Sequence, residues 1–361
     1  PSFPRPPPPP SSPSRMRPLL PVRPPSGLLA RCGGRKFRTP TVLMLCICFA
    51  LCCPAAGEQG GDEGCALRAV VTAATSGKYF DSLQNLVSSV QGLEHSLPIL
   101  VYDLGMTAEE AATAASWEGV ALRRLWMDAY PPHVASMDPP NYAWKAAVLI
   151  DAAEHIGCVL WIDAGVELRA RLDIVRAKMM ERGHFFLVSW AGAYIHTLVG
   201  WVHPGQPAAL GISAARMEEL TPQWQLAAGT IGINRNGSAW TDVFVPWWRC
   251  CLRQECILPD GANSSNHRWE QSALSLIVHE ANQERSLRGE QPFYVHQDPM
   301  FMKSNSMLFE PQIEALLQPG FTFEGLVLFA RRSHYPKPFA RFVRVWPAGG
   351  QPLPVLVQGH G

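Results

Sequence analysis

One stretch decides the fold of this chain: Val159-Leu160-Trp161-Ile162-Asp163-Ala164-Gly165-Val166-Glu167. Its apolar and aromatic residues lead up to a carboxylate, and the turn signal Asp-Ala-Gly follows at once. A short apolar run bounded in this way predicts a buried strand, central in a parallel sheet. A carboxylate at the carboxyl end of such a strand lies at the sheet edge where open α/β folds bind ligands. Asp163 is therefore the first candidate for chemistry, although Asp-Ala-Gly also suits a plain turn.

Strand-like and helix-like segments alternate on both sides of this stretch. Thr107, with Glu110 three residues later, predicts a capped helix start. The alternation predicts an α/β fold with a mostly parallel sheet flanked by helices, in a single large domain. We expect strands at 66–72, 98–103, 120–126, 185–190, 225–234 and 293–296, helices at 79–90, 107–117, 141–156, 172–182, 240–251 and 267–277, and an irregular loop at 131–140.

The N-terminal part of the chain has the composition of a targeting segment. Residues 1–40 are rich in Pro and Arg and predict disorder. Residues 41–57 are apolar and end in small residues, which predicts a signal peptide or a signal anchor. A linker at 58–65, a globular domain at 66–345 and a flexible tail at 346–361 complete the expected organisation.

The distribution of charge argues against nucleic acid as a partner. The chain has a formal net charge of +1, but residues 1–40 hold eight basic and no acidic residues. The rest therefore carries 23 basic against 30 acidic residues. A mildly acidic globular part lacks the basic surface of a nucleic-acid-binding domain.

Cysteines and glycosylation signals agree with the secretory pathway. Asn236-Gly237-Ser238 and Asn263-Ser264-Ser265 are both glycosylation acceptors. A disulfide within 250–256 is expected in an oxidising lumen, and the cysteines after the leader form no Cys-x-x-Cys pair of the kind that structural zinc sites use. We expect the protein in the Golgi or ER lumen as a type II membrane protein, or secreted, with the membrane as a partner if the anchor stays uncleaved.

Several motifs in a fixed order resemble the GT-A nucleotide-sugar glycosyltransferases. They are Thr-Ala-Ala-Thr-Ser before a helix (72–76), Tyr142-x-Trp144-Lys145, the Trp-Ile-Asp strand (161–163), Ala-Ala-Gly (227–229) and His-Arg-Trp-Glu-Gln-Ser (267–272). The closer likeness is to lumenal glycosyltransferase-like proteins with a similar Tyr-x-Trp-Lys helix. The resemblance covers roughly 66–340 and implies a GT-A-like, Rossmann-type sheet. It also implies transfer of a sugar from a nucleotide-sugar donor to a glycan or glycoprotein acceptor.

The resemblance assigns expected roles to individual residues. Asp163 matches the first carboxylate of an Asp-x-Asp motif that holds Mn²⁺ or Mg²⁺, with His334 as a second metal ligand. Asp163, Glu270 and Gln271 are the expected catalytic residues, the last two near the transferred sugar. The expected nucleotide-sugar contacts are Thr72, Ala73 and Ala74 at the base and ribose, Lys145 and Lys337 at the diphosphate, and Gly229 beside Ala228 on the acceptor side.

The sequence departs from this pattern at the metal motif. Gly165 stands where the second Asp is expected, and Glu167 follows two residues later, on the same face of an extended segment. The metal site is then rebuilt with another ligand such as His296, or donor binding is independent of metal, or the domain is a non-catalytic lumenal binding module. A hydrolase that uses Asp163 and Glu270 as an acid–base pair is a third reading.

Overall fold

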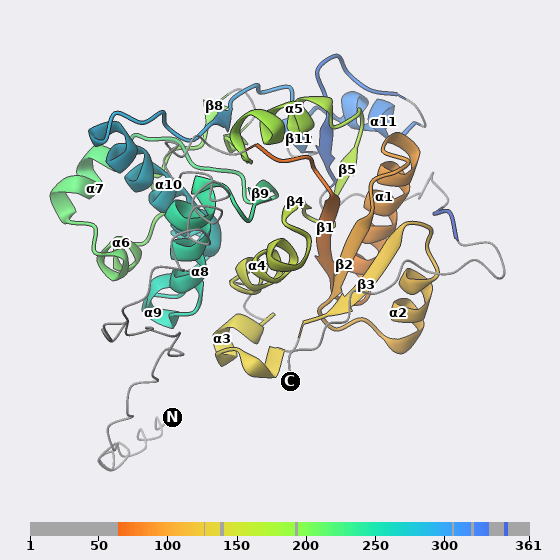
Figure 1. Cartoon of the computed structure of the whole chain (residues 1–361), viewed down its shortest axis with the longest axis horizontal. Coiled ribbons are helices and arrows are strands. Elements are labelled where there is room, and N and C mark those ends of the chain that lie inside the picture. Colours follow the sequence, from red (N-terminus) through yellow and green to blue (C-terminus); the bar gives the residue numbers. More distant parts are fainter. Residues whose placement is uncertain are drawn as a thin grey trace, which may run out of the picture. The chain divides into compact units, whose positions relative to one another are not determined.

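The computed structural model describes residues 64–125, 127–137, 141–191, 194–304, 307–318, 321–331 and 343–345 (Figure 1). The predicted leader at 41–57, the segment 1–40, most of the linker, the tail at 346–361, and both His334 and Lys337 lie outside these residues. Among the described residues, no helix combines the length and the apolar character needed to cross a membrane.

A seven-stranded sheet in the order β10-β6-β9-β4-β1-β2-β3 forms the centre. Strand β9 runs antiparallel to β4 and β6, and the other neighbours are parallel. The predicted α/β class and mostly parallel sheet are confirmed. The strands are β1 Ala69–Ala74, β2 Ile99–Asp103, β3 Val120–Arg124, β4 Cys158–Ile162, β6 His184–Leu187, β9 Thr230–Asn234 and β10 Val295–His296.

Two smaller sheets and the helices complete the described fold. The sheet β11-β12-β5 consists of Met302–Ser304, Leu328–Ala330 and Val166–Leu168, and β7 Trp190–Ala191 pairs with β8 Tyr194–Ile195. The helices are α1 Lys78–Leu93, α2 Ala108–Ala115, α3 Pro132–Ala135, α4 Trp144–Ile156, α5 Asp173–Arg182, α6 Gly205–Leu210, α7 Ala214–Leu220, α8 Val245–Cys251, α9 Gln254–Ile257, α10 Trp269–Leu287 and α11 Glu310–Leu317, with a 3-10 turn η1 Met127–Ala129 and a π-helix η2 Trp240–Phe244.

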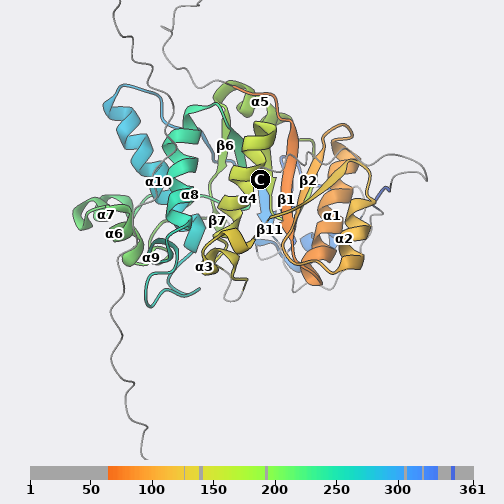
Figure 2. The same cartoon turned by 60° about the horizontal axis from the view of Figure 1, so that its bottom comes forward.

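Alternate residues of the central strands fill two separate cores. In β1, Val71 and Ala73 pack with α4, α8 and α10, whereas Val70 and Ala74 pack with α1, α2 and α5. This follows from the period of two in a strand, whose successive side chains point to opposite faces. Helices α1 and α2 accordingly lie on one side of the sheet and α8 and α10 on the other (Figure 2). The central strands are covered on both faces, which explains their continuous apolar sequence.

Three predicted segments differ from the structure in detail. The stretch 159–167 is not one strand: β4 ends at Ile162, Val166 N donates to Asp163 O across a turn (2.9 Å), and β5 joins another sheet. The loop expected at 131–140 contains the short helix α3, with Pro at its first turn. The helix expected at 240–251 begins as a π-helix, since Val245 N bonds Trp240 O, five residues back, just before Pro246, which has no N–H.

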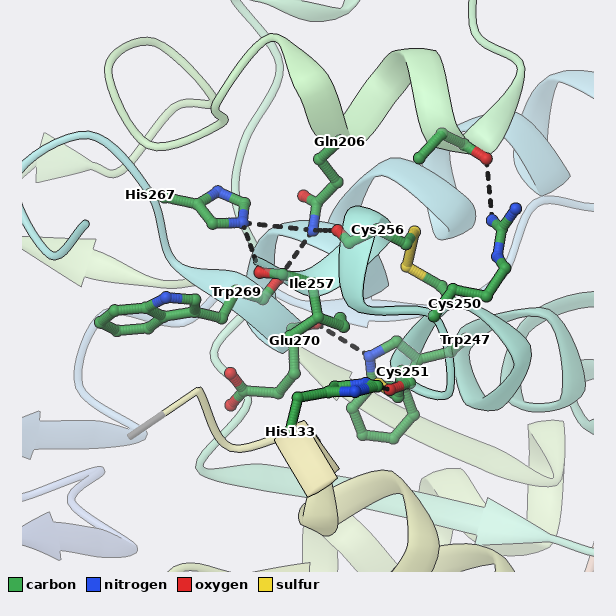
Figure 3. The surroundings of a disulfide bond; sticks show 12 residues. His133, Gln206, Trp247, Cys250, Cys251, Cys256, Ile257, His267, Trp269 and Glu270 are labelled. Carbon is green, nitrogen blue, oxygen red and sulfur yellow. Dashed lines mark hydrogen bonds between the residues drawn. A yellow bond between two sulfur atoms is a disulfide. The ribbon is translucent and has the colours of Figure 1, made fainter. Parts of the chain in front are cut away.

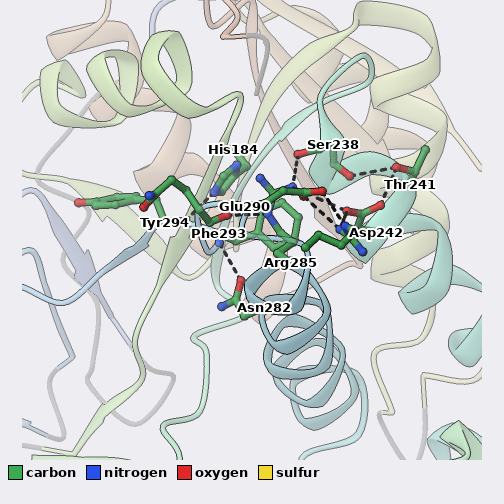
Figure 4. A network of polar contacts seen from close by, with 11 residues as sticks. His184, Ser238, Thr241, Asp242, Asn282, Arg285, Glu290, Phe293 and Tyr294 are labelled. Carbon is green, nitrogen blue, oxygen red and sulfur yellow. Dashed lines mark hydrogen bonds and ion pairs between the residues drawn. The ribbon is translucent and has the colours of Figure 1, made fainter. Parts of the chain in front are cut away.

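A network around Arg285 fixes the carboxyl-terminal end of α10 (Figure 4). The Arg285 guanidinium donates to Ser238 Oγ (3.1 Å) and to Gln291 O (2.6 Å) and pairs with Glu290 (3.4 Å). Its Cζ lies 4.5 Å from the Phe293 ring centroid. These contacts tie α10 to the segments before η2 and β10, so the helix that carries Glu270 is anchored at its far end.

Gly232 in β9 packs closely against neighbouring residues, a common reason for glycine inside a strand. A Cβ at Gly232 would lie 2.5 Å from Met179 Sδ and 2.7 Å from Phe185 Cβ. We expect Gly232→Ala to lower the free energy of unfolding by about 1–3 kcal/mol, because the packed core has to shift. Urea unfolding followed by circular dichroism measures this difference.

Gly92 provides the matched control for this prediction. A Cβ at Gly92, near the end of α1, meets nothing within 4 Å. Gly92→Ala should leave the stability unchanged or raise it by up to about 1 kcal/mol through helix propensity. Equal stability of the two variants would contradict the close packing at Gly232.

Candidate active site

The carboxyl edge of the central sheet brings the predicted residues together. Strands β1 and β4 run parallel and end at this edge, where Asp163 directly follows β4. The antiparallel strand β9 begins at the same edge, and Asp163 N donates to Gly229 O (3.0 Å). Asp163 and Gly229, 66 positions apart in the sequence, are therefore held side by side by the backbone.

A buried ammonium group joins two carboxylates at this edge. Lys145, in the first turn of α4, places its Nζ 3.0 Å from Asp163 Oδ1 and 3.3 Å from Glu270 Oε1. The same Nζ donates to Ala228 O (3.1 Å). The Lys145 side chain is 4% exposed. An ammonium has three N–H groups and meets three acceptors here, so it is saturated by the protein.

Asp163 keeps one oxygen available for a ligand. Its Oδ1 accepts from Lys145 and from Trp161 Nε1 (2.7 Å). Its Oδ2 has no hydrogen-bond donor within the described part of the chain and lies beside Gly229, where an added Cβ would be 3.2 Å away. The Asp163 side chain is 41% exposed. Lys145 and Trp161 thus orient the carboxylate, and the missing side chain at Gly229 leaves its second oxygen accessible.

Glu270 is a buried acid whose pKa is raised. It lies in the first turn of α10, and its side chain is 5% exposed. The pKa of Glu270 is raised to about 7, and burial is the largest cause. The positive charge of Lys145 lowers this pKa, and the negative charge of Asp163 raises it. One ammonium cannot fully compensate two carboxylates, so the second one holds a proton easily. Glu270 can therefore accept or donate a proton near neutral pH.

Hydrogen bonds from neighbouring helices position the start of α10 (Figure 3). Gln206 in α6 donates through Nε2 to Trp269 O (3.1 Å) and to Cys256 O (2.9 Å). Trp247 Nε1 in α8 donates to Glu270 O (2.8 Å). One of these acceptors, Cys256 O, belongs to a residue that is also held by the Cys250–Cys256 disulfide. The sequence favoured a disulfide at 250–256, but gave no signal for Gln206 or Trp247.

The other residues expected to contact the sugar donor are buried, bonded to the backbone or outside the described residues. Thr72, Ala73 and Ala74 are buried inside β1, and the first exposed residues after them are Ser76 and Gly77. Gln271 donates through Nε2 to Leu226 O (2.7 Å), which fixes the segment before β9. His334 and Lys337 lie outside the described residues.

The described residues do not fit a divalent cation on their own. Glu167 does not join Asp163, because it forms a buried ion pair with Arg169 and a second one with Arg331 (3.2 Å). His296 is buried and bonds the Tyr294 hydroxyl (2.7 Å). Within the described ranges, no group of three or more His, Cys, Asp or Glu side chains is arranged to hold a metal ion. A single free carboxylate oxygen is too few ligands for Mg²⁺ or Mn²⁺.

The comparisons with known proteins find similarity only among solved structures. No family model and no curated protein matches the chain. Mouse xyloside xylosyltransferase 1, in its apo form, is 12% identical with a TM-score of 0.42 and covers 75% of this chain and 99% of its own. The galactosyltransferase LgtC, in complex with donor and acceptor sugar analogues, is 15% identical with a TM-score of 0.39 and covers 78% of this chain and 92% of its own. At these values the likeness carries no function by itself, and a function has to be argued from the site.

Proposed function

We propose that this protein is a glycosyltransferase of the hexosyltransferase type, which transfers a sugar from a nucleotide-sugar donor to a glycan or protein acceptor. The observation that carries the proposal is the Asp163–Lys145–Glu270 cluster at the carboxyl edge of the sheet. It combines a carboxylate with a free oxygen and an acid of near-neutral pKa. Sugar transfer needs both a group that binds sugar hydroxyls and a group that removes a proton.

The proposed reaction uses these groups as follows. Glu270, in its carboxylate form, accepts the proton of an acceptor hydroxyl, and that oxygen bonds to the anomeric carbon of the donor sugar. The bond between the anomeric carbon and the diphosphate oxygen breaks, and its electron pair leaves with the nucleoside diphosphate. Asp163 Oδ2 accepts a hydrogen bond from a sugar hydroxyl. The positive charge of Lys145 stabilises the negative charge that develops beside it.

The expected Mn²⁺ or Mg²⁺ has no step in this scheme, because the described residues offer it one carboxylate oxygen. A cation is already present at Asp163 in the form of the Lys145 ammonium (3.0 Å). We therefore propose that donor binding does not depend on a divalent cation held by these residues.

Two disulfides and two accessible sequons support a place in the secretory pathway. Cys65 pairs with Cys158 and Cys250 with Cys256, and such bonds persist in oxidising compartments. Asn236 and Asn263 are both exposed. With the predicted leader at 41–57, these features favour the Golgi or ER lumen, as a type II membrane protein, or secretion.

The alternative is a non-catalytic lumenal domain that binds glycans. It is favoured by the saturation of Lys145, whose three N–H groups already have protein acceptors. The glycosidase reading is weaker. Asp163 and Glu270 share one ammonium between them, whereas a glycosidase needs its scissile bond between the two carboxyl groups.

Nucleotide binding separates the transferase from the binding domain. Isothermal calorimetry with UDP and GDP on residues 58–361 should show binding of at least one nucleotide, with a Kd that changes less than about threefold between EDTA and Mn²⁺. In Asp163→Ala the bare nucleotide should bind as in the wild type. The matching nucleotide sugar should bind about tenfold or more weakly, because a hydrogen bond to a charged group is lost.

Two other outcomes have definite meanings. Binding that requires Mn²⁺ and disappears in Asp163→Ala would show a metal site completed by residues beyond the described ranges, such as His334. If neither nucleotide binds the wild type under any condition, the protein is a binding domain rather than a transferase.

A further inference from the structure

Two aromatic residues with left-handed backbones flank the charged cluster. Tyr142 (φ 56°) and Trp269 (φ 43°) are the only non-glycine residues with positive φ in the part of the chain that the structure describes. Tyr142 lies two residues before the start of α4, and Lys145 N donates to Tyr142 O (2.9 Å). Trp269 is adjacent to Glu270. Tyr142 therefore lies three positions before Lys145, and Trp269 lies one position before Glu270.

The surrounding structure holds both residues in this conformation. The Asn141 side chain bonds Ala143 N (2.9 Å) and His133 O (2.6 Å), which fixes the turn at Tyr142. Gln206 bonds Trp269 O (3.1 Å). Bulky residues at positive φ are rare and persist only where the structure over-determines them. If the turns alone mattered, Asn or Gly would occupy these positions with less strain.

The two rings lie together beside the cluster and are only partly buried. Their centroids are 6.0 Å apart with an interplanar angle of 60°. Both residues have intermediate exposure. The Lys145 Nζ lies 5.6 Å from the Tyr142 centroid. Figure 3 shows the Trp269 ring and the Glu270 carboxylate on the same side of the Cys250–Cys256 disulfide.

We propose that Tyr142 and Trp269 form a platform that binds the apolar face of a pyranose ring, with the sugar hydroxyls reaching Asp163 Oδ2. The inference rests on the proposed function for its substrate class. Aromatic rings bind such faces because they offer a rigid apolar surface at low entropic cost. The carboxylate beside the rings supplies the polar acceptor that an apolar surface lacks, and its side chain is 41% exposed.

The test compares ring removal with ring retention at both positions. Tyr142→Asn and Trp269→Asn remove the ring but tolerate a left-handed backbone. Tyr142→Phe and Trp269→Phe keep a ring and serve as controls. Calorimetry is run with UDP, GDP, UDP-glucose, UDP-galactose, UDP-N-acetylglucosamine and GDP-mannose, and with maltotriose, chitotriose and N-acetyllactosamine. Thermal unfolding checks that each variant is folded.

The platform predicts a loss confined to the sugar part of the ligand. The Asn variants should weaken binding of a nucleotide sugar about tenfold or more, with bare nucleotide unchanged, if the platform holds the donor sugar. They should weaken binding of an oligosaccharide by a similar factor if it holds the acceptor sugar. The Phe variants should stay within about threefold of the wild type.

The outcomes also separate this inference from the proposed function. Oligosaccharide binding that needs both rings, in a protein that binds no nucleotide, supports the platform and rejects the transferase. Nucleotide-sugar and oligosaccharide affinities that the Asn variants leave unchanged would overturn the platform while the transferase stands. Absence of sugar binding in the wild type, whether or not a bare nucleotide binds, would also overturn the platform.

Discussion

Glu270→Gln is expected to lower kcat by about 10²–10⁴-fold, the usual contribution of a positioned general base. Gln has the same shape and can still accept a hydrogen bond from Lys145 Nζ, which lies 3.3 Å from Glu270 Oε1. It cannot take up a proton from an acceptor hydroxyl. Release of nucleoside diphosphate, measured with the donor and acceptor that the wild type uses, gives the rate.

The pH dependence of the same reaction provides a second readout. Because the base must be deprotonated, kcat/KM of the wild type should rise with pH through an apparent pKa near 7, the value for Glu270. The negative charge of Asp163 contributes to that raised pKa. Asp163→Asn should therefore move the acidic limb of the profile to lower pH, even though its overall activity is reduced.

An exposed glutamate on the same helix supplies the control for both experiments. Glu284 lies on α10 but is exposed and far along the helix from the cluster. Glu284→Gln should leave the rate and the pH profile unchanged. If Glu270→Gln stayed within threefold of the wild type, Glu270 would be a structural acid, and its proposed role as the general base would be rejected.

The sequence predicts the three members of the cluster, but not the way they meet. Asp163 was indicated by its place after a buried strand, and Lys145 and Glu270 by the order of motifs. Their shared contact depends on the starts of α4 and α10 lying next to the residue that follows β4, which local patterns do not encode. The third acceptor of the ammonium, Ala228 O, is a backbone atom, so no side-chain type in the sequence indicates it.

The main error at the site concerned Glu167. The sequence placed it on the same face as Asp163, which requires one extended strand through Gly165. The turn at 163–166 breaks that strand, and β5 pairs antiparallel with β12 instead. Glu167 then faces Arg331 and Arg169. A period-two argument fails across a turn, because the turn resets which face each later residue occupies.

The positive φ angles of the two aromatic residues could not be predicted from the sequence either. Tyr142 and Trp269 stood within recognised motifs, but nothing in those motifs indicates positive φ. Gly and Asn are the residues that signal such a backbone. Here the tertiary contacts of Asn141 and Gln206 impose it, so only the structure could reveal it.

Lys145→Met is expected to lower the free energy of unfolding by about 3–5 kcal/mol at pH 8, as when one partner of a buried ion pair is removed. Met keeps most of the side-chain volume but leaves Glu270, only 5% exposed, without its cation. Asp163 contributes less to the loss, because its side chain is 41% exposed and solvent screens its charge. Chemical unfolding at constant pH measures the difference.

The loss should shrink as the pH falls, and this separates charge from packing. A carboxyl group whose folded-state pKa is raised favours folding when protonated, so its destabilising effect grows as pH rises through the folded pKa. Loss of Lys145 raises the pKa of Glu270 further, since Lys145 lowers it. The loss in Lys145→Met should therefore be smaller at pH 5 than at pH 8 by up to about 1.4 kcal/mol, the value of one extra bound proton over the one pH unit between a pKa of about 7 and pH 8. The double variant Lys145→Met/Glu270→Gln should recover most of the stability at pH 8. A deficit that is equal at pH 5 and pH 8, and that Glu270→Gln does not relieve, would mean that Lys145 stabilises the fold by packing alone.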